Sequence, residues 1–538
     1  MTVPPRAALA THAVENQPDP RPGPDLGADP ALRDALAAFG GRAADVEAAA
    51  RAFGAPDAWE DAAEARRDAP RLALFDRGGR RLDEVRFAPG YHRMMARGAE
   101  AGYAALAWDG RPGGHVTHAA LVYLLSQVEP GVCCPLTMTY AAVPALAADP
   151  ALAALWTPKL TARAYDPALA PVAEKRAATL GMAMTEKQGG SDLRANTTRA
   201  DPDGDLWRLT GHKWFCSAPM SDGFLTLAQT DAGLTCFLVP RWLEGARNAI
   251  RLQRLKDKLG NRANASAEIE YHGALAWQLG EEGQGVRTII RMVHHTRLDT
   301  ATAPAGLMRA ALDEALRWCA GRTAFQRRLI DQPLMRAVLA DLALDAAGTL
   351  AAALRVARAF DDPAQAGFAR IAVALAKYLS NKRCPTVVAE AMECLGGMGY
   401  VEDTPLPMLY REAPLNGIWE GSGNVICLDI LRTLAREPLA AEALAAELDA
   451  ARGADGGDDA ALDAHRARWP GLPPEAEARW FAESLATLLA GAVLLGRAPG
   501  PVAEAWCATR LGAPRGQVPG AVAGLDAEAL LARVENPG

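Results

Sequence analysis

The chain has 538 residues, 50% of them apolar, with a net charge of −7 and a pI near 5.8. This composition is typical of a soluble globular protein with a large core, and the length suffices for about three or four domains. The acidic balance gives no support for nucleic-acid binding by the chain as a whole.

Cysteine and histidine usage argues against disulfide bonds and metal sites. The nine cysteines are odd in number and form no C-x-x-C, and the nine histidines form no H-E-x-x-H. We therefore expect a reducing, cytoplasmic environment and no bound metal. The pair His294-His295 fits helix surface and packing better than a metal site.

Signals for export or membrane insertion are weak. The first twenty residues lack an apolar segment, which predicts that they are not a secretion signal. The longest apolar run, Leu485–Gly496, is too short to span a bilayer and predicts a buried helix. We therefore expect no membrane partner.

The first third of the chain is predicted to be mostly helical. Residues 1–30 are rich in proline and aspartate and should be extended. A helical pattern then covers residues 31–180. Its first helix is predicted to begin at Pro30, directly after Asp29, and to end at Gly40-Gly41.

The pattern changes near residue 181. Short runs such as DLWRLTGHKWFCS, GFLTLAQT, TCFLVP and SAEIEYHG hold aromatic and β-branched residues in partial alternation. Glycine, aspartate and asparagine separate these runs. This predicts a compact antiparallel β domain over residues 181–286.

Helices are predicted again over residues 287–437. The stretch LMRAVLADLAL places Leu334, Val338 and Leu342 on one helix face. After residue 437, ARGADGGDDAALDAH is predicted to be a loop or linker. Residues 438–538 would form an appended helical domain.

Four short stretches could contact a ligand. The chain has no P-loop and no G-x-G-x-x-G at a strand-to-helix turn, so a Rossmann nucleotide site is not expected. Other stretches offer hydroxyls, glycine backbone, aromatic rings or a cation. They are Met184–Asp192, Lys213–Ser217, Arg322–Phe325 and Leu395–Tyr400. Each by itself is more often a turn or a core strand.

A fifth stretch, GIWEGSGN at residues 417–424, places Glu420 between Trp419 and a small, flexible loop. Gly-Ser-Gly-Asn is turn chemistry, and a nearby glutamate favours a helix N-terminus, so one interpretation is a helix cap. The other is a catalytic base that the small residues allow a ligand to approach. These eight residues by themselves favour the cap.

The order of the motifs is more specific than any one of them. TE-x-x-GGSD, KWF-x-S, R-x-x-F, GG-x-GY and WEGSGN on a helix–β–helix chain resemble the acyl-CoA dehydrogenase flavoprotein family. MTEKQGGSDLRANTTRA, LKDKLGNRANAS, DQPLMR, YREAPLNGIWEGSGN and THAVENQP resemble its AidB-like branch of DNA-alkylation-response proteins. The resemblance implies an α+β fold with an N-terminal helical domain, a middle antiparallel β-barrel, a C-terminal helical bundle and an appended helical domain.

The resemblance also implies FAD, held between the β domain and the C-terminal helices. The residues that match flavin contacts are Met184, Thr185, Gly190, Ser191, Trp214, Phe215 and Ser217. Those that match contacts to the FAD phosphates are Arg322, Phe325, Gly396 and Gly397. Arg322 and Phe325 correspond to residues that reach the FAD of a neighbouring subunit, which implies a homotetramer built as a dimer of dimers.

Two positions depart from the family pattern near the expected pyrophosphate. Gln326 stands where many relatives have glycine, and Glu393 stands where many have glutamine. A carboxylate beside a pyrophosphate would repel it. Either Glu393 turns away, or the adenine half of FAD is held differently.

Glu420 matches the glutamate with which many family members remove the α-proton of an acyl-CoA thioester. Trp419 would form an apolar wall, and Gly421 and Ser422 would leave room for flavin. Asn424 would bond to the cofactor. The alternative is that Glu420 is retained for structure, without turnover.

The branch is associated with protection from alkylating agents and with binding of double-stranded DNA through the appended domain. Residues 441–538 carry eight arginines, no lysine and fourteen acidic residues, a balance of −6 that opposes phosphate binding. DNA binding would therefore require that folding gathers arginines on one face. The candidates are Arg432, Arg436, Arg466, Arg468, Arg479, Arg497, Arg510 and Arg515.

Two functions are compatible with the sequence. One is a flavoprotein of the DNA-alkylation response with weak α,β-dehydrogenation of acyl-CoA thioesters. The other is a fully active short- or branched-chain acyl-CoA dehydrogenase without a DNA role.

Overall fold

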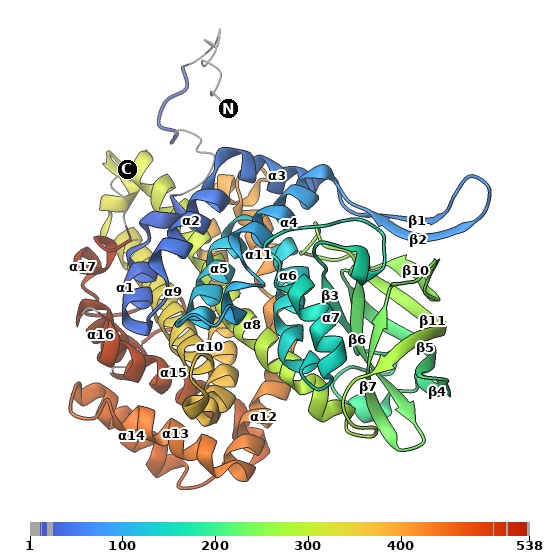
Figure 1. Ribbon diagram of the computed structural model, residues 1–538. Helices are drawn as coiled ribbons and strands as arrows, with labels where there is room; N and C mark the ends of the chain where they lie inside the picture. Colours follow the sequence, from blue (N-terminus) through green and yellow to red (C-terminus); the bar gives the residue numbers. More distant parts are fainter. Residues whose placement is uncertain (1–10, 12, 19–24, 499, 513–514, 535–538) are drawn as a thin grey trace. The chain divides into compact units, whose positions relative to one another are not determined.

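The structure is a computed structural model that describes residues 11, 13–18, 25–498, 500–512 and 515–534 (Figure 1). The chain forms two compact units. The helical unit is drawn from Met1–Trp59, His115–Val128 and Thr300–Gly538, and the sheet unit from Glu60–Gly114 and Glu129–Asp299. Most of the predicted extended segment 1–30 lies outside the described residues, and the domain bounds expected from the sequence remain a prediction.

The helical unit is built from two long central helices and shorter helices around them. Its helices are α1 (Pro30–Phe39), α2 (Ala43–Gly54), α5 (Gly114–Val128), α9 (Pro333–Phe360), α10 (Ala366–Cys394), α11 (Leu406–Glu412), α12 (Gly423–Arg436), α13 (Pro438–Asp449), α14 (Gly456–Arg468), α15 (Ala478–Arg497), α16 (Gly500–Trp506) and α17 (Ala527–Leu531). α3 (Pro56–Arg67) and α8 (Gly285–Gly321) run from one unit into the other.

α1 begins and ends where the sequence predicts. The Asp29 carboxylate accepts a hydrogen bond from the backbone N–H of Ala31, and Pro30 needs no such partner because it has no N–H. Gly40 ends the helix with φ at 79°, a conformation that glycine adopts without strain.

The sheet unit combines one main sheet with a hairpin and three helices. Its strands are β1 (Arg71–Phe75), β2 (Arg81–Arg86), β3 (Leu180–Ala183), β4 (Arg199–Asp203), β5 (Leu206–Ser217), β6 (Gly223–Thr230), β7 (Gly233–Pro240), β8 (Trp242–Leu243), β9 (Ala246–Arg247), β10 (Ile250–Leu255) and β11 (Ser266–Gln278). Its helices are α4 (Pro89–Ala101), α6 (Pro130–Leu146) and α7 (Pro150–Leu160).

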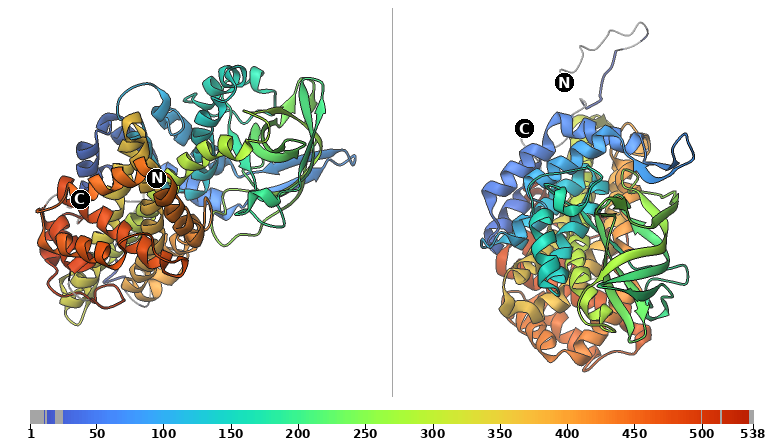
Figure 2. Two further views of the ribbon diagram at one scale, coloured as in Figure 1. Left: turned by 90° about the horizontal axis from the view of Figure 1, so that it is seen from below. Right: turned by 45° about the vertical axis from the view of Figure 1, so that its right-hand side comes forward.

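Five strands close into a ring, green in Figure 2. β11 pairs with β5, β5 with β4, β4 with β6, β6 with β7, and β7 with β11 again, while β10 and β3 extend the sheet. The β4–β6 and β3–β6 pairings are parallel and the others are antiparallel. The ring encloses a core that includes Phe224, Phe237 and Tyr271. The predicted β-barrel fold is therefore confirmed.

Two local predictions are wrong. Residues 71–86 form the β1–β2 hairpin, which projects from the sheet unit in Figure 1, inside a range predicted to be helical. The hairpin has its own signals, because RLALF alternates and Gly79 adopts a φ of 80° in the turn. Most of the predicted linker after residue 450 is helix α14, which Asp455 caps at Gly457 and Asp458.

The appended helices pack on the two central helices of the helical unit. Arg510 bonds to Asp345 on α9 at 2.9 Å, and Arg515 bonds to Asp341 on the same helix at 2.9 Å. Within the part of the chain that the structure describes, two stretches are long and apolar enough to cross a membrane, Pro333–Phe360 and Glu475–Arg497. However, 78% and 72% of their apolar windows are buried inside the protein. Both therefore have the character of core helices.

Candidate cofactor and active site

In the sheet unit, two of the predicted flavin-binding stretches lie against each other. The backbone N–H of Trp214, on β5, donates to the carbonyl of Thr185 at 2.8 Å. Gly190 folds back onto Thr185, and a Cβ at Gly190 would come within 2.4 Å of the Thr185 hydroxyl oxygen. The Thr185 side chain therefore leaves no room for a side chain at position 190. The loop also places the Thr185 hydroxyl beside β5, the strand that carries Trp214 and Phe215.

A buried ion pair fixes this arrangement. Glu186 accepts from the Lys213 ammonium at 2.8 Å, and both side chains are fully buried. The Glu186 carboxylate also accepts from the backbone N–H groups of Thr197 and Thr198. Burial alone would raise the pKa of Glu186, but the Lys213 charge and these hydrogen bonds lower the pKa to about 2. Burial lowers the pKa of Lys213 to about 8 against the attraction of the carboxylate.

Three cationic side chains lie close to the ring of Trp214. The Lys256 ammonium lies 3.3 Å from the ring centroid, with Lys187 at 5.5 Å and the Arg254 guanidinium at 5.7 Å. Phe215, the next residue, is half exposed. The aromatic pair that the sequence predicts beside flavin is thus surrounded by positive charge.

The other predicted residues of the sheet unit border the same junction. The hydroxyl of Ser217, at the end of β5, lies 3.2 Å from that of Ser266 on β11. The Met184 carbonyl accepts from the side-chain amide of Asn196 at 3.0 Å, and Ser191 is exposed. All seven predicted flavin-ring residues therefore lie on two adjoining segments.

In the helical unit, a buried lysine holds the loop of Glu420. The Lys377 ammonium, on α10, donates to the carbonyls of Asn416 and Gly421, both at 2.9 Å. The indole N–H of Trp419 donates to the Asn416 side chain at 2.8 Å. Glu420 therefore lies between two carbonyl groups bound by one cation.

Glu420 itself has a backbone conformation unusual for its residue type. Its φ is 57°, in the left-handed region that disfavours residues with a Cβ. The N-cap of α12 is Ser422, two residues later. Glu420 is therefore not the N-cap residue of that helix, and the same stretch supplies the N-cap at Ser422. Strained positions of this kind cluster at functional sites.

Two residues of this region, Lys377 and Arg479, were not predicted from the sequence to belong to the cofactor or active site. Lys377 is the single charged residue in the apolar run IAVALAKYL at residues 371–379, and that charge is the signal available in the sequence. Arg479, on α15 of the appended segment, donates to the Asn424 side chain at 3.2 Å. No spacing rule links residues 424 and 479, so only the fold could join them.

The predicted phosphate-binding stretches lie near each other at the far end of α10. Arg322 precedes a short hairpin of β12 (Thr323–Ala324) and β13 (Arg327–Arg328), and Phe325 at its tip is 94% exposed. Nearby, the Cys319 thiol donates to the Cys394 carbonyl at 4.0 Å, just before Gly396.

Gly396 and Gly397 begin the 3-10 helix Gly396–Tyr400 and are exposed, and a Cβ at either would meet nothing within 4 Å. Glu393, on the last turn of α10, is exposed as well.

The predicted phosphate-binding residues and the loop of Glu420 are associated with different parts of α10. Lys377 and Cys394 lie seventeen residues apart on α10, which corresponds to about 25 Å of helix. The helical unit therefore separates the phosphate-binding residues Arg322, Phe325, Gly396 and Gly397 from the loop of Glu420.

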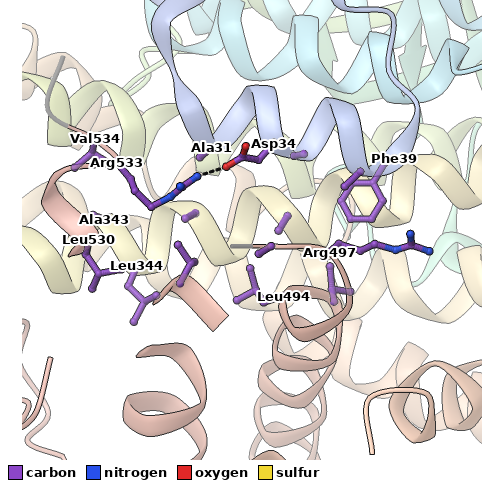
Figure 3. A pocket seen from close by; sticks show the side chains of 17 residues that line it. Ala31, Asp34, Phe39, Ala343, Leu344, Leu494, Arg497, Leu530, Arg533 and Val534 are labelled. Carbon is purple, nitrogen blue, oxygen red and sulfur yellow. Dashed lines mark hydrogen bonds and ion pairs between the residues drawn. The ribbon is translucent and has the colours of Figure 1, made fainter. Parts of the chain in front are cut away.

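An apolar hollow occurs elsewhere in the helical unit (Figure 3). It lies between α1, α9, α15 and α17 and is partly open to solvent. Its rim carries the ion pair Asp34–Arg533 and the side chain of Arg497. None of the predicted cofactor residues, all of which the structure describes, lines it.

The arginines considered for DNA binding are largely engaged within the protein. Arg510 is buried, Arg515 and Arg466 pair with Asp341 and Asp449, and Arg468 stacks on the Trp480 ring at 3.5 Å. Arg510 is therefore excluded from such a face, and a face built from the other arginines stays a prediction.

Comparison with known proteins gives the family. The AidB N-terminal domain profile ("Adaptive response protein AidB N-terminal domain") matches residues 16–167, and the middle and C-terminal acyl-CoA dehydrogenase domain profiles match residues 181–274 and 283–435. The chain is 45% identical to AidB of Escherichia coli (strain K12), over 93% of this chain and 94% of that one.

Solved structures agree with the sequence relatives. Caenorhabditis elegans ACDH-11 in complex with C11-CoA superposes with a TM-score of 0.84 at 27% identity, covering 96% of both chains. The apo form of Bd2924 superposes with a TM-score of 0.82 at 30% identity, covering 91% of this chain and 100% of that one. The chain is thus a member of the acyl-CoA dehydrogenase family, in its AidB-like branch.

Proposed function

We propose that this protein binds FAD and catalyses α,β-dehydrogenation of an acyl-CoA thioester, with Glu420 as the base. The observation that carries the proposal is the conformation of Glu420. A glutamate kept in the left-handed region costs about 1–2 kcal/mol. Two hydrogen bonds from Lys377 hold the loop in the conformation that keeps Glu420 in this left-handed region. A residue retained only for packing would not need that conformation.

The residues present fit FAD. Thr185, Gly190 and Trp214 form one junction with a hydroxyl, close backbone and an aromatic ring. Gly396 and Gly397 offer exposed backbone with open space above it, which suits phosphate oxygens. FAD, when bound, supplies the acceptor for the hydride that leaves the substrate β-carbon.

Glu420 would take the α-proton of the thioester onto its carboxylate. Trp419, held by Asn416, would provide an apolar wall that keeps water from the base. Lys377 would position this loop rather than contact substrate, since its ammonium already serves two backbone carbonyls.

We propose that the protein assembles as a homotetramer, built as a dimer of dimers, and the separation of the two groups along α10 supports a contribution from a neighbouring subunit. About 25 Å of α10 lies between Lys377, which holds the loop of Glu420, and Cys394, beside the phosphate-binding residues. Two groups spaced in this way serve the same FAD more readily when one of them belongs to a neighbouring subunit. The 94% exposed Phe325 supports this assignment, because a large apolar side chain at a hairpin tip suits an interface.

Anaerobic addition of acyl-CoA thioesters tests the proposal. Purified protein should carry FAD absorbance, and a matching thioester should bleach it. The panel should run from four to about twelve carbons, because ACDH-11, a related protein, is described in complex with C11-CoA. Glu420→Gln should retain FAD and lose bleaching by at least about 10³-fold.

Ile418→Ala, in the same stretch and at a side chain that is 65% exposed, is the matched control and should keep most of the bleaching rate. Bleaching by Glu420→Gln at the rate of the native protein would exclude Glu420 as the base. Flavin that no thioester reduces would leave Glu420 as a structural relic of the family mechanism.

The DNA-alkylation role is a second proposal, supported by the branch to which the chain belongs. The charge of the appended segment and its engaged arginines weigh against a strong interaction. Fluorescence titration of a labelled DNA duplex at low and moderate salt tests this role. Binding that weakens steeply with salt would support it. No binding at low salt would exclude DNA as a direct partner.

A further inference from the structure

The short segment Asn16–Pro18 lies on the hairpin that carries Arg322 and Phe325. The Asn16 side chain donates to the Thr323 carbonyl at 2.8 Å and accepts from the Thr323 N–H at 2.6 Å. The Asn16 carbonyl accepts from the Arg322 guanidinium at 3.0 Å. These three bonds join residues more than 300 positions apart in the sequence.

Asparagine is specified at position 16 by both its side chain and its backbone. A side-chain amide offers a hydrogen-bond donor and an acceptor together. The Asn16 amide thus pairs with the backbone N–H and carbonyl of Thr323 in the way that the backbone of a neighbouring strand would. The φ of Asn16 is 54°, in the left-handed region where asparagine is enriched. Pro18 packs closely on Gly321, because a Cβ at position 321 would lie 2.9 Å from the Pro18 ring.

The hairpin needs such support because it is intrinsically weak. It has two paired residues on each strand, Thr323 with Arg328 and Ala324 with Arg327. Both residues of its turn have positive φ, Phe325 at 51° and Gln326 at 62°, where Asn-Gly would be usual. An isolated two-stranded hairpin is marginal even with a favourable turn.

We propose that Asn16–Pro18 is a clamp that holds Arg322 and Phe325 in the geometry that binds the cofactor phosphates, with Asn16 as a positioning residue. This inference rests on the proposed function. Arg322 keeps further N–H donors free for an anion after bonding to Asn16, because a guanidinium carries five. The ring of Trp318, 5.4 Å from the guanidinium, limits its movement on the other side.

Two substitutions at one position test the clamp. Asn16→Ala and Asn16→Gly both remove the amide, and Gly also tolerates the positive φ. Both should weaken FAD binding by about tenfold, measured as free flavin fluorescence on dilution of the purified holoprotein. With FAD in excess, bleaching by a matching thioester should return to the native rate, and the melting temperature should be unchanged.

Val14→Ala is the matched control, since Val14 belongs to the same segment and is 51% exposed. A double-mutant cycle with Arg322→Ala adds a readout that a structural role would not move. If Asn16 acts through Arg322, the two losses in FAD affinity should be clearly less than additive.

The outcomes separate the clamp from the proposed function. Native protein without flavin would overturn both. Native protein with flavin and unchanged FAD affinity in both Asn16 variants would overturn the clamp alone. Full additivity with Arg322→Ala, or a lowered melting temperature with unchanged affinity, would also overturn it.

Discussion

Glu420, Phe325 and Gln326 share a backbone conformation that their side chains disfavour. Each has φ between 51° and 62°, and each lies in a stretch that the family resemblance marks as part of the cofactor site. Such residues persist only where their surroundings determine them. At Glu420 the determinant is Lys377, and at the hairpin tip it includes Asn16. Functional sites are where a residue is most often found in a backbone conformation that its own type disfavours.

Glu420→Gly and Glu420→Gln separate the strain at this position from its chemistry. Both remove the carboxylate, so both should lose bleaching of the flavin. The glycine variant also relieves the left-handed strain and should exceed the glutamine variant in free energy of unfolding by about 1 kcal/mol. Urea denaturation of the FAD-saturated proteins measures this difference. Equal stability of the two variants would mean that the loop carries no strain at Glu420.

At the scale of elements, the junction between β3 and β5 depends on one ion pair. Glu186 follows β3, and Lys213 lies in the middle of β5, so their pairing brings the hydroxyl-bearing loop to the aromatic strand. Removing one partner of a buried pair leaves the other uncompensated, at a cost of about 3–5 kcal/mol. The side of the sheet unit that we propose to bind flavin therefore depends on this ion pair for its stability.

The Glu186 carboxylate should make the stability of the protein depend on acid pH. Its pKa is about 2 in the folded state against an ordinary 4.5. The unfolded chain thus binds more protons between these values, and the stabilisation present above pH 4.5 is lost as pH falls to 2. The loss is on the order of 3 kcal/mol.

Denaturation of native protein and Glu186→Gln across this pH range measures the effect. The stability difference between them should shrink as pH falls from 4.5 to 2. A constant difference for Glu186→Gln would show that the pair does not titrate in this range.

At the scale of the whole molecule, the exposed apolar residues of the helical unit point to assembly. Phe325 is 94% exposed, Leu334 85% and Tyr400 83%. Leu334 lies at the start of α9, on the helix face that it was predicted to share with Val338 and Leu342. A side chain of this size in water is costly unless another surface covers it.

Phe325→Ser should therefore weaken assembly without unfolding the chain. We expect a smaller particle by light scattering after gel filtration and at least tenfold weaker FAD retention, because the cofactor would be shared between subunits. Leu439→Ser, equally polar and at a site 76% exposed on α13, is the control and should change neither. Unchanged mass and FAD content in Phe325→Ser would remove the hairpin from the interface.

Prediction from sequence succeeded where a signal is local. Asp29, Pro30 and Gly40 mark the ends of α1 because capping depends on neighbours within four residues. It failed at the β1–β2 hairpin and at α14, where alanine and charge obscured short patterns. The burial of Arg510 was also out of reach, since its partners lie about 165 residues away.

Residue patterns along the chain were enough to predict the helix–β–helix arrangement, the motif series and the family, because these depend on periodicity and on residue identity. The tertiary structure decided the backbone of Glu420, its support by Lys377, the link from Arg479 to Asn424 and the seat of Asn16 on Thr323. Each of these joins segments distant in the chain. Their pairing depends on which faces of the helices meet, and that is set by the packing of the whole unit.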